Sequence, residues 1–85
     1  MQFEGNELAL NFTTSEGGIV RIGIEDESGS PIDGFGIDEC VPLHGDSIAE
    51  VVAWKGGDDV GALAGRPVRL RFGLEAADLY SFVFR

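Results

Sequence analysis

The sequence has little cysteine, few basic residues and no long apolar run. Cys40 is the only cysteine, so no internal disulfide can form. Cysteine content therefore does not indicate whether the protein works in an oxidising or a reducing compartment. Six Lys and Arg stand against 15 Asp and Glu, which gives a formal net charge of −9. Phosphate backbones and anionic lipids repel such a surface, so we expect neither a nucleic-acid partner nor a membrane partner. No stretch has the length of apolar sequence that a membrane span needs.

The length of the chain limits it to one small domain. At 85 residues there is room for a single hydrophobic core, and residues 1–85 are therefore expected to form one domain. The 13 glycines indicate many turns rather than long helices.

Alternating apolar and polar residues predict short strands. The pattern places them near residues 8–12, 20–24, 32–40, 48–54, 68–74 and 79–84. Gly17-Gly18 is expected to reverse the chain between the first two strands, which would then pair with each other. Glu50 interrupts the alternation of the fourth strand, and a bulge there would restore it.

Strands separated by turns favour an all-β fold with two packed antiparallel sheets. We expect a small antiparallel β-sandwich, immunoglobulin-like or jelly-roll, with a closed barrel as the alternative. One helical turn at most is expected, capped by Asp58 or Asp59 and ending near Gly65. The predicted inward-facing residues are Leu8, Leu10, Phe12, Val20, Ile22, Ile24, Trp54, Val68, Leu70, Phe72, Phe82 and Phe84.

Several segments of the chain together resemble a known module. They are Gly34-Phe35, Cys40, Gly45-Asp46 and the stretches 51–57, 63–72 and 77–82. The chain is similar, from about Phe3 to Phe84, to the C-terminal β-sandwich of bacterial proteins whose larger part is a five-bladed-propeller glycosidase-like domain, related to invertases and inulinases. This resemblance implies that the propeller carries the chemistry. The chain would then be a non-catalytic accessory module of a larger glycosidase-like protein, and that protein's catalytic domain would be its partner.

Two aromatic residues, Trp54 and Tyr80, are the candidates for a binding site. Each is the only residue of its type, and each belongs to an apolar alternation that favours core packing. An exposed aromatic ring is a flat platform for a sugar, and Asp46 or Asp58 could accept hydroxyl hydrogen bonds beside it. A carbohydrate-binding module for oligosaccharides is therefore the alternative function. Burial of Trp54 between the sheets would instead favour the non-catalytic accessory module.

The basic residues gather near the C-terminal end of the chain. Arg69 and Arg71 lie two apart on a predicted strand and project from the same face, with Arg66 just before them. Pairing with acids such as Glu25 is the simplest role, and contact with the parent domain is the functional alternative. An exposed parent-facing surface would also let the isolated domain form a homo-oligomer.

The acidic residues lie in turns, where Asp is common for conformational reasons. We therefore expect no catalytic carboxylate pair, no cofactor and no metal, although a structural calcium ion is a minority alternative. His44 is expected in an exposed turn, and Cys40 as a buried, unreactive thiol. The residues that calcium would use are Asp26, Glu27, Asp33 and Asp38, or the pair Asp58 and Asp59.

Overall fold

The computed structural model describes residues 2–85, and within them the fold is all-β, as predicted. Three strands form one antiparallel sheet in the order β2-β1-β3: β1 (Leu8–Asp26), β2 (Ser47–Val51) and β3 (Val68–Phe84). Two short 3₁₀ helices accompany them, η1 (Ile37–Glu39) and η2 (Gly61–Leu63). The second is the predicted helical turn, and the first was not expected. No helix in this part of the chain is both long and apolar enough to cross a bilayer.

The chain turns at Gly17-Gly18, but the segments on either side do not pair with each other, so the predicted hairpin was wrong. The predicted first two strands form the single strand β1, which pairs with β3 both before and after the glycines. Thr14 lies opposite Ala77 and Ile19 lies opposite Glu75, so β1 has four residues between these positions where β3 has one. This mismatch bends the two-stranded ribbon instead of ending it.

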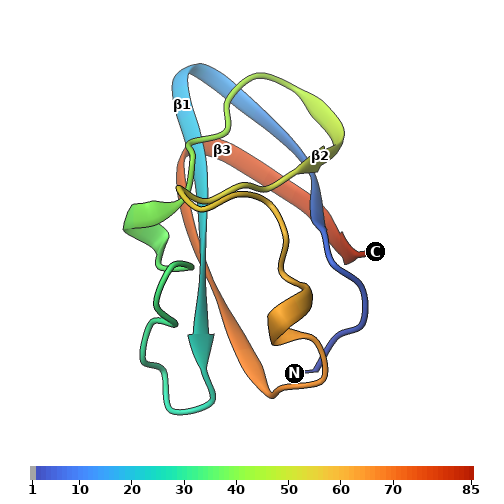
Figure 1. Cartoon of the computed structure of the whole chain (residues 1–85). Helices are drawn as coiled ribbons and strands as arrows, with labels where there is room; N and C mark the ends of the chain where they lie inside the picture. Colours follow the sequence, from blue (N-terminus) through green and yellow to red (C-terminus); the bar gives the residue numbers. More distant parts are fainter. Residues whose placement is uncertain (1) are drawn as a thin grey trace.

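The bend folds the ribbon so that its two halves enclose the core. In Figure 1 β1 rises, turns over at the top and descends, and β3 accompanies it in the opposite direction. The apolar faces of both halves meet in one cluster, which includes Leu10 and Phe12 from the first half and Ile22 and Ile24 from the second. The two layers are therefore halves of one bent sheet, and the separate second sheet of the predicted sandwich is not present among residues 2–85.

The predicted strand over residues 32–40 was also wrong. This segment contains η1 and forms no ladder: Cys40 makes an isolated bridge with Trp54, and Ile32 and Phe35 each make one backbone hydrogen bond to Ile24 of β1. One reason lies in β1, where Gly23 leaves the space into which Ile37 packs; a Cβ at Gly23 would lie 2.7 Å from the Ile37 amide nitrogen. The segment therefore packs across the face of the sheet and does not form a strand of it.

The core is closed on the side of β1 and open on the side of β3. Most of the predicted inward-facing residues are buried, including Trp54 and Val68. Phe72 and Phe82 were expected inside as well, but 37% and 42% of these residues are exposed. The reason is the strand order, because β3 is an edge strand with nothing beyond it in the sheet.

The two ends of the described chain are tied together. The amides of Asn6 and Glu7 both donate to the carbonyl oxygen of Arg85 at 3.0 Å. The Phe3 and Phe84 rings stack with centroids 3.9 Å apart. These contacts hold the N-terminal segment across the end of β3.

Gly18 provides a direct test of the bend. A Cβ at this position would lie 2.9 Å from the carbonyl oxygens of Ser15 and Glu75 and closer still to that of Ala76. We predict that Gly18→Ala lowers the free energy of unfolding by about 1–3 kcal/mol, since backbone atoms must shift to accept it. Gly56→Ala is the matched control, because a Cβ there meets nothing within 4 Å. Equal urea midpoints for the two variants would contradict this account.

Candidate functional site

A bulge in β3 turns Tyr80 out of the core. The register passes from Asn11 opposite Ser81 to Phe12 opposite Leu79, so Tyr80 is an additional residue in β3. A bulge interrupts the alternation of faces and re-aims a side chain. Tyr80 is accordingly 67% exposed, and the prediction that it packs in the core with its neighbours was wrong.

A second bulge lies on the other side of β1 at the same level. Between Ser47 and Glu50, β2 has two residues where the paired segment of β1 has one, which confirms the bulge predicted near Glu50. Ala49 adopts a left-handed backbone conformation with φ of 59°. Ile48 projects outward and is 88% exposed. A non-glycine residue at positive φ costs energy, so the surrounding contacts must hold it in place.

The Asn11 side chain joins the two bulges. Its Oδ1 accepts a hydrogen bond of 2.7 Å from the Ala49 amide in β2, and its Nδ2 donates one of 2.6 Å to the Ser81 hydroxyl in β3. One amide on the central strand therefore fixes both neighbouring strands where they depart from regular pairing. Asn11 was not among the residues expected to have a role, although a polar residue at the centre of an apolar alternation was the available signal.

The two bulges border a hollow in the surface, which we call the Tyr80 hollow. Its volume is about 620 Å³. Tyr80 and Ile48 contribute exposed apolar surface, and the remaining positions contribute two hydroxyl groups and a carboxylate. The residues that line it are Phe12, Thr13, Asp46, Ser47, Ile48 and Tyr80.

Hydrogen bonds orient the polar groups of this hollow. The hydroxyl oxygens of Thr13 and Tyr80 lie 3.1 Å apart. Since only one hydroxyl hydrogen is used between them, the other remains to donate to a ligand. Oδ1 of Asp46 accepts a long hydrogen bond, 3.4 Å, from the Thr14 amide, and no hydrogen bond to Oδ2 occurs within residues 2–85.

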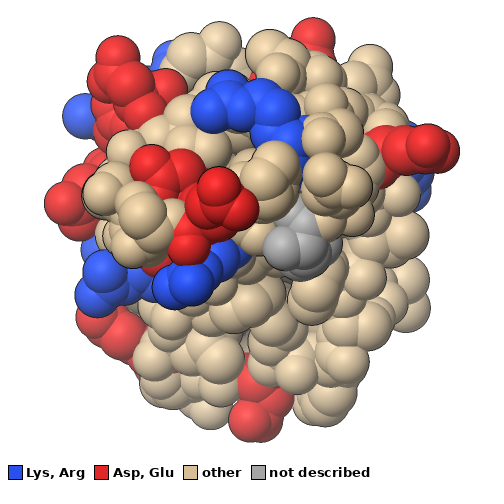
Figure 2. All heavy atoms as spheres, turned by 90° about the horizontal axis from the view of Figure 1, so that it is seen from below, with Lys and Arg blue, Asp and Glu red and all other residues tan. Residues whose placement is uncertain are grey.

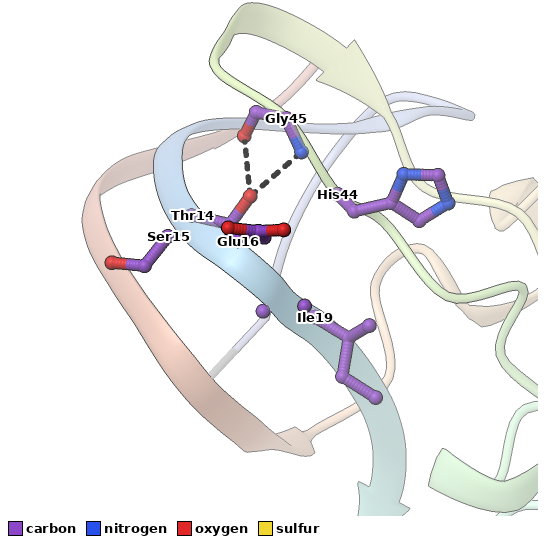
Figure 3. Close-up of a pocket in the computed structure, with 8 residues that line it drawn as sticks. Thr14, Ser15, Glu16, Ile19, His44 and Gly45 are labelled. Atoms are coloured by element: carbon purple, nitrogen blue, oxygen red, sulfur yellow. Dashed lines mark hydrogen bonds between the residues drawn. The ribbon is translucent and has the colours of Figure 1, made fainter.

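A second hollow of about 410 Å³ adjoins the first at the bend of β1 (Figure 3). Thr14 connects its two walls, because the hydroxyl donates to the Gly45 carbonyl at 3.1 Å and accepts from the Gly45 amide at 2.7 Å. His44 and Glu16 also line it, but Figure 3 shows the His44 ring extending away from Thr14 and Glu16. The two side chains do not form an acid–base pair, and His44 is exposed as predicted.

Trp54 is buried, so it offers no platform to a ligand. The residue is 2% exposed, and its indole N–H donates to the Ile22 carbonyl oxygen at 2.9 Å. The Phe35 ring contacts it edge-on with centroids 5.4 Å apart. Of the four predicted ligand-binding residues, only Asp46 and Tyr80 come together; Asp58 is exposed and lies outside the Tyr80 hollow.

The predicted arginine face lies at the lower end of the molecule. Arg71 makes an ion pair with Glu25, with Nη1 and Oε2 3.6 Å apart. This contact confirms the prediction that the arginines pair with acids such as Glu25. Arg66 and Arg69 are exposed. Figure 2 views the molecule from this end and shows basic and acidic side chains intermingled on one part of the surface and few charges on another.

The acids proposed for calcium do not gather into a site. Within residues 2–85 no three His, Cys, Asp or Glu side chains lie close enough together to hold a metal ion. Asp26 instead closes its own turn, where Oδ1 accepts from the Ser28 hydroxyl at 2.6 Å and the Ser30 amide at 3.0 Å. These hydrogen bonds lower the pKa of the Asp26 carboxyl below its ordinary value.

Cys40 is a buried thiol, as predicted. Its sulfur accepts from the Ile22 amide and lies 3.4 Å from both the Ile22 nitrogen and the Val41 carbonyl oxygen. Burial raises the pKa of the thiol, so it stays protonated and unreactive near neutral pH.

No protein-family model, no curated protein and no solved structure matches this chain. The similarity to the accessory module of glycosidase-like proteins therefore stays an expectation from the sequence.

The Trp54 hydrogen bond yields a stability prediction. Replacing Trp54 with Phe removes the indole N–H and leaves the buried Ile22 carbonyl oxygen without this donor. We expect the free energy of unfolding to fall by about 1–3 kcal/mol, the usual effect of leaving a buried polar group unsatisfied. Tyr80→Phe is the control, since Tyr80 is exposed, and it should leave the urea midpoint almost unchanged.

The Asp26 turn yields a prediction about pH. An acid whose pKa is lowered by folding stabilises the folded state above its unfolded pKa, and this contribution is lost as the pH falls through the folded pKa. Ser28→Ala removes the strongest hydrogen bond to this carboxylate, so the Asp26 pKa should rise toward its ordinary value. Carboxyl-detected NMR titration measures the change. An unaltered Asp26 pKa in the variant would show that the Ser28 hydroxyl is not its cause.

Proposed function

We propose that this chain is a non-catalytic accessory module that packs through β3 against a neighbouring folded domain. The observation that carries the proposal is the open side of the core along β3. Burying this side would complete a hydrophobic core that the described residues leave partly uncovered.

The first support is the unpaired edge of β3. The strand is 17 residues long and pairs only with β1 among the strands of residues 2–85. Long exposed edges present unpaired N–H and C=O groups, and proteins usually shorten, charge or cover them. A strand from a neighbouring domain could extend the sheet here.

The second support is the apolar surface beside this edge. Phe72, Leu74 and Phe82 are each 37–43% exposed. The Phe72 and Phe82 rings come from opposite halves of the folded ribbon, yet their centroids are only 5.7 Å apart. The exposed rings thus form one continuous patch, of the kind that marks an interaction surface. We name it the β3 face and define it by these three residues.

The charges around the β3 face indicate what kind of neighbour would fit. Arg69 and Arg71 are exposed and lie along the same open strand as Phe72, with their side chains on its other face, whereas the rest of the chain is strongly acidic. A neighbour with acidic groups flanking an apolar strand would complement this arrangement. From the resemblance of the sequence, we propose that this neighbour is a glycosidase-like propeller, which would perform any catalysis.

The pKa shifts of two groups have structural causes. Hydrogen bonds that close its turn lower the pKa of Asp26, and burial raises the pKa of Cys40. Neither group lies in the Tyr80 hollow.

The proposal is tested by titrating the ¹⁵N-labelled chain with a purified five-bladed glycosidase-like domain from the same genome. We expect chemical-shift changes to concentrate on β3, and Phe82→Glu to weaken binding at least about tenfold. Ile48→Glu is the matched control, because Ile48 is exposed but lies away from the β3 face. Binding that is lost in Ile48→Glu and retained in Phe82→Glu would refute the proposed interface.

A further inference from the structure

We propose that the Tyr80 hollow is a binding site for a neutral pyranose ring of an oligosaccharide. This function is separate from docking through β3 and uses different side chains. Of the two sugar platforms suggested by the sequence, Trp54 is buried and Tyr80 is exposed at the bulges.

The hollow is held in shape by features that general folding does not require. Both bulges and the left-handed Ala49 occur at one level of the sheet, and Asn11 hydrogen-bonds to both outer strands there. Their combined effect is to bring two large apolar side chains, Ile48 and Tyr80, into solvent. Bulges are common beside binding sites because they re-aim side chains, and strained backbone gathers at sites for the same reason.

The chemistry of the hollow fits a sugar ring. The faces of a pyranose carry C–H groups that pack on an aromatic ring, and Tyr80 offers its ring at 67% exposure. The edges carry hydroxyl groups that need both donors and acceptors. The Thr13–Tyr80 pair has one hydroxyl hydrogen to donate, and Asp46 has a carboxylate oxygen to accept. The Ser47 hydroxyl donates to Glu50 at 3.2 Å, so its oxygen can accept as well.

The charge of the site selects a neutral ligand. Asp46 is the one charged residue among those lining the Tyr80 hollow, and no Lys or Arg lines it. The chain as a whole carries a net charge of −9. Phosphorylated, sulfated or uronic-acid ligands would meet repulsion without a compensating base. The size, about 620 Å³, accommodates one or two sugar rings rather than a long chain.

The test is a titration of the ¹⁵N-labelled chain with neutral gluco- and galacto-oligosaccharides, followed by NMR. We expect saturable shifts at Thr13, Ile48 and Tyr80 with dissociation constants of about 0.1–10 mM, which is typical of a shallow site with few contacts.

Variants distinguish stacking from a structural effect. Tyr80→Ala should weaken binding at least about tenfold, whereas Tyr80→Phe keeps the ring and should retain affinity within about threefold. Asp46→Asn should also weaken binding by removing the strong acceptor. Val83→Ala is the matched control, because Val83 is an exposed residue of β3 outside the hollow.

Two outcomes overturn the inference. One is the absence of saturable shifts for every neutral sugar up to about 50 mM, well above the expected range. The other is binding that persists unchanged in Tyr80→Ala. A negative result for sugar binding would leave the proposed docking through β3 untouched, because docking depends on Phe72 and Phe82. A negative result for docking would likewise leave the sugar site untouched.

Discussion

The structure depends on the pairing of β1 with β3, two long strands that stay together through a bend. This one ribbon supplies both layers of the domain; β2 and the isolated bridges attach to the β1 side of it, and the N-terminal segment lies across the end of β3. Pairing of distant segments in this way is what allows 85 residues to enclose a core without a second sheet. The same arrangement makes β3 an edge strand, which has β1 as its one strand neighbour within residues 2–85. The closed core and the open β3 face therefore have one origin.

Each irregularity of the ribbon has a structural or functional consequence. The extra residues at 15–18 produce the bend, and Gly18 permits the close approach of the backbone at Ala76. The extra residues in β2 and β3 expose Ile48 and Tyr80 and border the Tyr80 hollow. Regular strands of the same composition would bury more apolar surface. The bulges therefore remove two apolar side chains from the core and place them on the surface.

Sequence alternation predicted the fold class and most of the core, because burial on one face imposes a period of two. It could not predict that the chain continues through Gly17-Gly18, since paired glycines suit a tight reversal and a sharp bend equally well. The exposure of Tyr80 was missed for a related reason, as one additional residue shifts every later side chain to the other face. The alternation favoured core packing for both Trp54 and Tyr80, and only Trp54 is buried.

The open edge of β3 is tested most directly by amide hydrogen exchange of the monomeric chain, measured residue by residue. In an edge strand of an antiparallel pair, alternate amides point toward the partner and toward solvent. We predict an alternating pattern along the regular stretches of β3 on either side of Ala76 and Tyr80, with slow exchange for amides bonded to β1 and fast exchange for the outward ones. Uniformly slow exchange along β3 would contradict it, because the outer edge would then already be covered.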